Sequence, residues 1–165
     1  MKSNDSIMPT PTIQTSLGNT DILQTPLTAF LCSRQVPAAA VLRCYDWAIA
    51  QREAGITVIS GFHSPLEQDV FRYLLKGRQP VVLALARGLK KQWEPALQKA
   101  YDDGRLLIIS PFDEHVKRAS TSNAIVRNAL MIDLAEQIVI GYAKEGGFLE
   151  RQLVGVSKLI KYLTD

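Results

Sequence analysis

The sequence predicts one α/β domain built as three layers, with a mostly parallel sheet of five or more strands between helices. Short runs of apolar, largely β-branched residues occur five times, as expected for strands buried on both faces. Between them lie longer segments in which apolar residues recur at helical spacing. Strands that alternate with helices favour a parallel sheet with helices on both of its faces.

The predicted elements follow one another in strict alternation, and proline and glycine mark the helix ends. Pro37 and Pro65 stand where helices begin, and Gly55 and Gly77 stand where those helices end. The predicted strands span residues 28–32, 56–60, 80–86, 106–110 and 137–141, and the predicted helices span residues 38–54, 65–75, 93–102 and 120–134.

The two ends of the chain differ from this pattern. Residues 1–27 are rich in Thr, Ser, Pro, Asn and Gln and have no apolar period, which predicts a polar N-terminal arm that is irregular or mobile. Residues 28–165 are predicted to form a single domain. In residues 153–163 the apolar positions Val156, Leu159, Ile160 and Leu163 have the spacing of an amphipathic C-terminal helix.

Composition excludes several classes of protein. The chain has 165 residues, of which 47% are hydrophobic and 21% charged, a balance typical of one globular domain. No apolar run approaches the ~20 residues that span a bilayer, and the first residues lack the features of a secretion signal. Cys32 and Cys44 are too few for a disulfide framework or a cysteine zinc site. We therefore expect a cytoplasmic protein that binds no membrane and no metal.

Each predicted strand ends in a polar or glycine-containing loop. In a parallel sheet these loops gather at the carboxyl edge, where ligands bind near a topological switch point. Backbone N–H groups at helix starts, together with Arg and Lys side chains, suit phosphate groups. The candidate ligand-binding residues, for DNA phosphate or a nucleotide, are Ser33, Arg34, Gly61, Phe62, His63, Ser64, Arg87, Gly88, Lys90, Lys91, Arg127, Asn128, Gly146 and Gly147.

Two of these loops have two interpretations each. Phe62 or His63 could stack on a base, or Phe62 could fill the core while His63 lies exposed in its loop. Lys90 and Lys91 near Trp93 suit single-stranded nucleic acid, or they form a solvated helix start beside a half-buried tryptophan. The other candidates also have alternatives without a ligand. Arg34 could be an ordinary surface arginine, Arg127 and Asn128 could make ion pairs within the domain, and Gly146 and Gly147 could form a tight turn.

The sequence contains no recognisable catalytic set. The loop after the first strand lacks the glycine fingerprint of dinucleotide-binding proteins, so we expect no nicotinamide or flavin cofactor. His63 has no nucleophile partner, and acidic residues such as Glu67 and Asp113 form no triad or metal set. Cys32 is interpreted as a buried small hydrophobe rather than a nucleophile. These observations predict a binding protein without catalysis.

Taken in order, the loops resemble the Rossmann-like core of the DNA-processing protein A (Smf) family. Residues 32–34 read Cys-Ser-Arg where that family has Gly-Ser-Arg, and residues 60–67 correspond to its Ser-Gly-x-Ala-x-Gly-Ile-Asp loop. Residues 88–93 correspond to its Gly-Leu-x-x-x-Tyr turn, residues 127–129 to its Arg-Asn-Arg motif, and residues 146–149 to its Ser-Gly-Ser-Leu turn. The resemblance covers residues 28–153.

The resemblance implies a Rossmann-like fold and a positively charged pocket at the carboxyl edge that binds single-stranded DNA without catalysis. It also implies a homodimer and a recombinase partner. Carried over to this chain, Arg34, Arg127 and Lys90 or Lys91 would hold phosphates, and Gly61, Gly146 and Gly147 would allow the backbone to approach them. Three departures from the family pattern, Ser64, Pro65 and Ala129, remove two positive charges from the expected pocket.

The wider superfamily supplies two alternative functions. One is a nucleotide-binding or nucleotide-sensing module without chemistry. The other is a phosphoribohydrolase that releases the base from a nucleoside monophosphate. Gly146, Gly147 and Glu150 are similar to part of the motif of those enzymes, but the turn lacks its proline, its Gly-Thr pair and the spacing to the glutamate.

Overall fold

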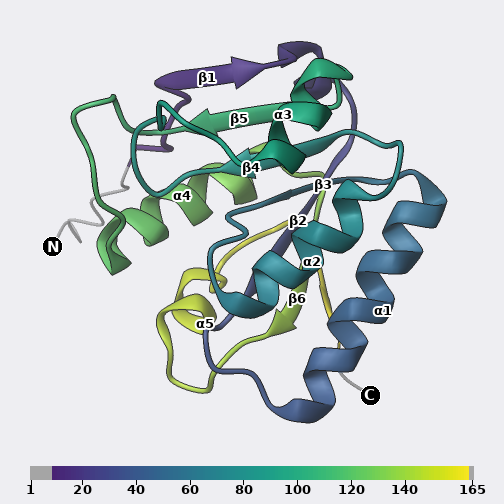
Figure 1. Cartoon of the computed structure of the whole chain (residues 1–165). Helices are drawn as coiled ribbons and strands as arrows, with labels where there is room; N and C mark the ends of the chain where they lie inside the picture. Colours follow the sequence, from purple (N-terminus) through teal and green to yellow (C-terminus); the bar gives the residue numbers. More distant parts are fainter. Residues whose placement is uncertain (1–8, 164–165) are drawn as a thin grey trace, which may run out of the picture.

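A computed structural model describes residues 9–163 of the chain. Its centre is a seven-stranded sheet with the order β1-β5-β4-β3-β2-β6-β7 (Figure 1). All neighbouring strands are parallel except β1 and β5, which are antiparallel. The strands are β1 (Thr15–Gly18), β2 (Leu27–Cys32), β3 (Thr57–Ser60), β4 (Val81–Ala84), β5 (Leu106–Ser110), β6 (Gln137–Tyr142) and β7 (Leu159–Tyr162).

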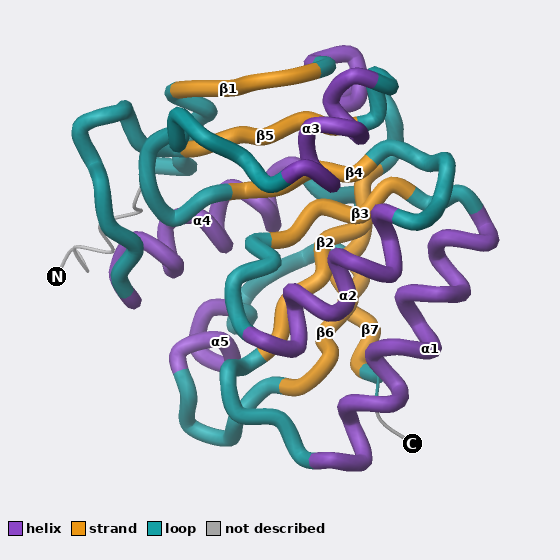
Figure 2. The backbone as a smooth tube through the Cα atoms, viewed as in Figure 1, coloured by secondary structure: helices purple, strands orange, loops and turns teal. Residues whose placement is uncertain are grey.

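Helices cover both faces of the sheet, as Figure 2 shows. The apolar cluster on one face takes Trp47, Phe71 and Leu97 from α1, α2 and α3. The cluster on the other face takes Met131 from α4 and Leu149 from α5. The helices are α1 (Ala38–Ala54), α2 (Pro65–Leu75), α3 (Pro95–Asp102), α4 (Thr121–Leu134) and α5 (Phe148–Gln152), with a 3-10 helix η1 at Thr20–Gln24. The predicted three-layer α/β fold is confirmed.

Local signals in the sequence explain where these elements begin and end. All residues of β3, β4 and β5 are buried, because helices cover the sheet on both sides and leave no polar face. Ser64 caps α2 and Pro65 opens it. Gly55 ends α1 in the left-handed conformation with φ 72°, which glycine adopts without steric cost. The five predicted strands therefore correspond to β2–β6.

The N-terminal segment contains more regular structure than its composition predicts. Residues 15–18 form β1, which pairs with Thr15 opposite Ser110 and Gly18 opposite Leu107, and Ile22 of η1 is buried. An irregular or mobile arm is therefore wrong for this part. β1 is an edge strand whose side chains are half-buried or exposed, so backbone hydrogen bonds to β5 hold it without a regular pattern of apolar residues in its sequence. Residues 1–8 of the predicted arm lie outside the described residues.

The C-terminal segment forms a strand where the sequence predicts a helix. β7 adds to the sheet parallel to β6, with Leu159 opposite Gln137 and Tyr162 opposite Ile140. Gly155 has φ 80°, a left-handed conformation that interrupts a helix after α5. The unpaired edge of β6 offers backbone hydrogen bonds that outweigh the helical spacing of the apolar side chains. The prediction of a C-terminal helix is wrong for this reason.

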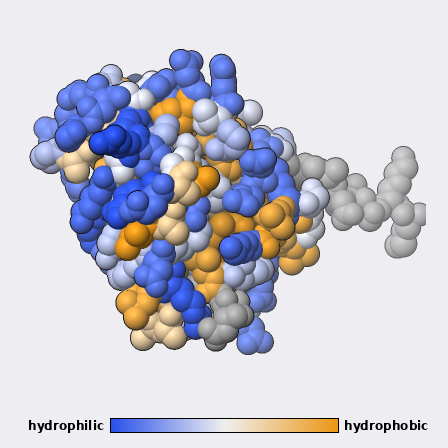
Figure 3. Space-filling view, turned by 90° about the vertical axis from the view of Figure 1, so that its right-hand side faces the viewer, coloured by the Kyte–Doolittle hydropathy of each residue, from blue (hydrophilic) through white to orange (hydrophobic). Residues whose placement is uncertain are grey.

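The surface has no single dominant apolar region on the face shown in Figure 3, where orange patches are separated by hydrophilic ones. Scattered apolar groups of this kind are normal for a folded domain. Among residues 9–163, no helix combines the length and the apolar character needed to cross a membrane.

Candidate functional site

A cavity of about 320 Å³ lies at the carboxyl edge of the sheet, between the ends of β2, β3 and β4 and the helix α4. β2 pairs with β3 on one side and β6 on the other, so this is the point where the strand order reverses and where ligands of such folds bind. Its lining residues come from five separate segments: Leu31, Cys32, Arg34, His63, Ser64, Glu67, Ala86, Ala119, Ser120, Thr121, Ala124, Arg127, Asn128 and Phe148.

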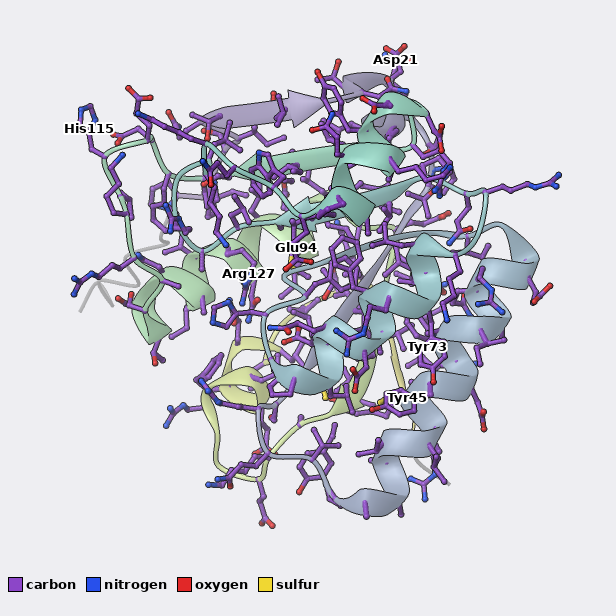
Figure 4. The ribbon with its side chains drawn as sticks, viewed as in Figure 1. Asp21, Tyr45, Tyr73, Glu94, His115 and Arg127 are labelled. Carbon is purple, nitrogen blue, oxygen red and sulfur yellow. The ribbon has the colours of Figure 1, made fainter. Side chains whose placement is uncertain are left out.

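Arg127 is the central cation of this cavity. It extends from α4 toward the middle of the molecule, as Figure 4 shows, and its side chain is only 7% exposed. Its Nε donates a hydrogen bond to Oδ1 of Asn128 at 3.0 Å. Among the described residues, neither of its terminal nitrogens has a hydrogen-bond or ion-pair partner. A buried guanidinium group with free donors facing a cavity is suited to hold an anion.

The charge of Arg127 is opposed by burial and supported by one neighbour. Burial lowers the pKa of Arg127, and the carboxylate of Glu67 acts in the opposite direction. Burial destabilises the charged form because the guanidinium loses water. An anion bound in the cavity would supply the favourable electrostatic interaction that the lost water no longer provides.

Gly61 allows the guanidinium group to lie against the loop between β3 and α2. A Cβ atom at this position would overlap Nη1 of Arg127 and would lie 2.5 Å from its Cζ. Any larger residue would therefore displace the arginine. The predicted role of Gly61, close approach of a ligand to the backbone, differs from its observed contact, which is with a side chain of the protein.

Glu67 is fixed at the wall of the same cavity. It is 7% exposed, and its Oε1 accepts a hydrogen bond from the backbone N–H of Ser64 at 3.1 Å. The Ser64 hydroxyl accepts in return from the N–H of Glu67 at 3.3 Å, which completes a capping box. Ser60 donates to Oε2 at 3.4 Å. The cavity thus holds two guanidinium groups, those of Arg34 and Arg127, against one carboxylate.

The N-terminus of α4 forms another wall. Ser120 is the N-cap residue, and its hydroxyl accepts a hydrogen bond from the N–H of Asn123 at 3.1 Å. The N–H groups of the first turn beyond the cap have no partner within the helix. Together with the helix dipole, they make this end of α4 electropositive.

The cavity brings together five of the predicted ligand-binding residues. Arg34, His63, Ser64, Arg127 and Asn128 all line it, although they come from three segments far apart in the chain. Their gathering follows from the parallel sheet, which places the loops after β2 and β3 at the same edge as α4.

Of the two interpretations of the β3–α2 loop, the structural one applies to Phe62, whereas His63 is both exposed and at the cavity. The Phe62 side chain is 5% exposed and stacks on Phe71 with ring centroids 4.1 Å apart, so it cannot stack on a base. It reaches the core from a backbone with φ 44°, a conformation uncommon outside glycine.

The basic turn after β4 lies outside the Arg127 cavity. Lys90 and Lys91 line two other hollows, one of about 450 Å³ with Asp113 and one of about 390 Å³ with Trp93. Trp93 is half-buried, as one of the two interpretations predicts. The structure therefore separates these lysines from the arginines with which the sequence grouped them.

Arg87 and Gly88 have structural contacts. Arg87 donates from Nε to the carbonyl of Gly88 at 3.2 Å, and the N–H of Gly88 donates to the carbonyl of Val116. A Cβ atom on Gly88 would collide with the Asp113 carbonyl. The Arg87 contact thus lies within the basic turn, and Gly88 holds the loop after β5 against that turn.

Three further predicted residues shape the loop after β6 and do not line the cavity. The Ser33 hydroxyl accepts a hydrogen bond from the N–H of Lys144 at 2.8 Å, which ties this loop to the end of β2. Gly146 has φ 73°, and its N–H donates to Glu150 at 3.3 Å. Gly147 is the N-cap of α5. The adjacent Phe148 is the residue of this loop that reaches the cavity.

Sequence reasoning missed several cavity residues, of which Glu67, Ser120 and Thr121 carry polar groups. Glu67 could have been found from the capping-box spacing Ser64-x-x-Glu67, which predicts a fixed carboxylate at the start of α2. Ser120 and Thr121 stand at the predicted helix start, a position that suits anions. No group of three or more potential metal ligands occurs in the described part of the chain.

Comparisons with known proteins agree with this architecture. The structure of DNA processing protein A from Helicobacter pylori, studied for its single-stranded DNA binding mode, matches with a TM-score of 0.71 and 17% identity over 89% of this chain and 69% of that one. DNA processing protein A from Streptococcus pneumoniae matches with a TM-score of 0.70 and 17% identity over 89% of this chain. This chain spans about half, 53%, of the S. pneumoniae chain.

A more distant match shares the fold. The molybdenum cofactor binding protein from Rippkaea orientalis has a TM-score of 0.54 and 10% identity, over 86% of this chain and 78% of that one. At these identities the solved structures show the fold alone. No curated protein matches the sequence. The family described as DNA recombination-mediator protein A matches residues 3–150, nearly the whole chain, and the protein therefore belongs to that family.

Proposed function

We propose that this protein binds single-stranded DNA at the carboxyl edge of its sheet and performs no catalysis there. The observation that carries the proposal is Arg127, a buried guanidinium group whose two terminal nitrogens have no partner among the described residues and which lines the cavity. Family membership and the single-stranded DNA binding studied in the H. pylori protein support the same function.

In this proposal the phosphates of the strand provide most of the binding free energy. Arg127 holds a phosphate inside the cavity, and the exposed Arg34 contacts it from the rim. Lys90 and Lys91 take phosphates further along the strand, beside Trp93. Because phosphates are common to every sequence, binding has little sequence preference. It also weakens as salt rises, because bound phosphates release their counterions.

The test is fluorescence anisotropy of a labelled oligothymidine across a salt titration, with duplex DNA as competitor. Arg34→Ala and Lys91→Ala are each expected to weaken binding and to lower the salt slope by about 0.7 for one lost phosphate contact. Arg78→Ala is the matched control, because this exposed arginine lies in a hollow with Arg52 and Lys76, away from both proposed contacts. Unchanged affinity in Arg34→Ala and Lys91→Ala would reject the site.

A nucleotide-binding module is the second candidate, favoured by the size of the cavity. At about 320 Å³ it lies at the small end of ligand pockets and suits one nucleotide. In that case His63 is the residue placed to contact the base. A nucleotide that raises the melting temperature of the protein when oligothymidine does not would favour this candidate.

Family membership also motivates two proposals about partners. We expect a homodimer, which sedimentation of the purified chain tests directly. We also propose a recombinase partner, which the family description supports, and co-sedimentation with a recombinase filament on single-stranded DNA tests it. A cytoplasmic location is proposed on the same basis, and fractionation of cells tests it.

A further inference from the structure

We propose that the Arg127 cavity takes a terminal phosphomonoester, the dianionic phosphate at the end of a strand or on a single nucleotide, in preference to a phosphodiester inside a strand. This inference deepens the proposed function, because it names the part of the nucleic acid that occupies the cavity. It rests on three observations at the same place: a deeply buried arginine with free donors in a small cavity, a helix N-terminus and the charge of the cavity.

The first observation is the depth of Arg127. Its side chain is 93% buried, since only 7% is exposed, so a phosphate that contacts its terminal nitrogens must itself enter the cavity. An internal phosphodiester carries a nucleoside on each side, whereas a terminal phosphate carries one. A cavity of about 320 Å³ has room for one nucleotide-sized group, which favours the terminal phosphate.

The second observation is the N-terminus of α4 in the same wall. α4 has 14 residues, and Ser120 and Thr121 at its start line the cavity with Arg127. The Ser120 hydroxyl accepts from the N–H of Asn123, whereas the N–H groups of Thr121 and Ser122 before it have no intrahelical partner because they begin the helix. In this proposal the N–H groups at the start of α4 and the guanidinium group of Arg127 both donate to the phosphate, each from its own wall of the cavity.

The third observation is the charge of the cavity. A phosphomonoester carries about −1.5 to −2 charges at neutral pH and three terminal oxygens, whereas a phosphodiester carries one charge and two such oxygens. Arg34 and Arg127 supply two positive charges, and both oxygens of Glu67 already accept hydrogen bonds from the loop. The carboxylate of Glu67 offsets one of these charges. The remaining positive charge and the electropositive end of α4 attract a dianion with three acceptor oxygens more strongly than a monoanion with two.

The experiment compares ligands that differ only at their ends. Competition anisotropy uses oligothymidine with a 5′-phosphate, with a 3′-phosphate or with hydroxyl groups at both ends, a circular oligothymidine without ends, and thymidine monophosphate against thymidine. We expect one phosphorylated end to tighten binding about five- to tenfold at pH 7.5 over the hydroxyl form. The advantage should shrink near pH 5, where the phosphate dianion takes up one proton and becomes a monoanion.

Variants of Arg127 link the effect to the cavity. Arg127→Gln removes the charge, and Arg127→Lys keeps the charge but loses the forked donors, so the end preference should fall below about twofold in both. Thermal denaturation checks that each variant is folded, and Lys is retained as the milder change if Gln unfolds the chain. Arg78→Gln is the control and should keep the full preference.

The outcomes separate this inference from the proposed function. If the circular, hydroxyl and phosphorylated strands bind equally well, the inference is overturned and single-stranded DNA binding stands. If thymidine monophosphate binds and no strand does, the phosphomonoester cavity stands and single-stranded DNA binding is overturned. If a 5′-phosphate and not a 3′-phosphate is preferred, the inference is supported and the occupied end is identified.

Discussion

Gly61 and Arg127 are mutually dependent: the guanidinium group occupies the space that a side chain at position 61 would need. A Cβ atom there would lie 2.5 Å from Cζ and 3.0 Å from Nε of Arg127. The position of the proposed anion-binding group is thus determined by the absence of a side chain in a loop that is distant in sequence.

Gly61→Ala is therefore expected to weaken binding of oligothymidine about tenfold by displacing Arg127. The measurement is anisotropy, with thermal denaturation in parallel. Gly55→Ala is the matched control, since a Cβ there meets nothing within 4 Å while its φ of +72° makes alanine strained. This control should lose stability by about 1 kcal/mol and keep its affinity. A Gly61→Ala variant with unchanged affinity would show that Arg127 is not a DNA contact.

Glu67→Gln is expected to have opposite effects on binding and stability. Removing the carboxylate removes one negative charge from the cavity, so affinity for single-stranded DNA should rise about threefold. The folded chain should become less stable by about 1–2 kcal/mol, because the buried Arg127 loses its nearby negative charge and the capping box is weakened. Glu53→Gln, at a carboxylate that is 72% exposed, should change neither quantity. Weaker DNA binding by Glu67→Gln would indicate that Glu67 orients Arg127.

The free energy of unfolding at alkaline pH is expected to depend on Tyr45. Its hydroxyl donates to Oδ2 of Asp69 at 2.5 Å, and Tyr45 and Tyr73 lie near each other between α1 and α2 (Figure 4). The hydrogen bond to Asp69, with burial and the carboxylate charge, raises the pKa of Tyr45 from 10 to about 12. A raised pKa means that the folded state holds the proton more tightly than the unfolded state.

The stability that Tyr45 contributes is consequently complete below pH 10 and lost as the pH rises from about 10 to about 12. Denaturant unfolding of the wild type should show this decline, and Tyr45→Phe should show a flatter dependence over the same range. Parallel curves for the two proteins would contradict the assignment.

Cys32 is expected to react slowly although it lines the cavity. A hydrogen bond with the Cys44 thiol, followed by burial, raises the pKa of Cys32, so little thiolate is present at neutral pH. Iodoacetamide at pH 8 should alkylate the native protein far more slowly than the same protein in urea, as mass spectrometry of tryptic peptides would show. Equal rates in the two conditions would contradict the raised pKa of Cys32.

The order of strands and helices could be predicted from the sequence because each signal is local. Pro65, the capping residue Ser64 and the glycine at position 55 act within one turn of helix. The gathering of Arg34 with His63 and Ser64 could also be predicted, because a parallel sheet places its loops at one edge. Arg127 lies within α4, and only the family resemblance placed it with them.

The remaining features depend on contacts that the local sequence does not contain. Phe62 turns into the core because Phe71 offers a stacking surface, and the Gly61 contact exists only because Arg127 arrives from a helix more than sixty residues later. Lys90 and Lys91 are directed to other hollows by the loop after β5, which packs against Gly88. Residues 159–162 form a strand because β6 has an open edge, although their spacing is helical.

The two outer strands of the sheet both come from the ends of the described chain. Thr15 lies opposite Ser110 in β1 and β5, so this ladder closes a very long loop, while β7 follows β6 after a short one. Closing a long loop costs more chain entropy than closing a short one, and pairings between distant segments form slowly. The ladder between β2 and β6, with Thr28 opposite Gln137, closes a still longer loop, so chain entropy does not single out β1. What β1 and β7 share is that each pairs on one side only, and we expect their amide protons to exchange with solvent before those of the five central strands.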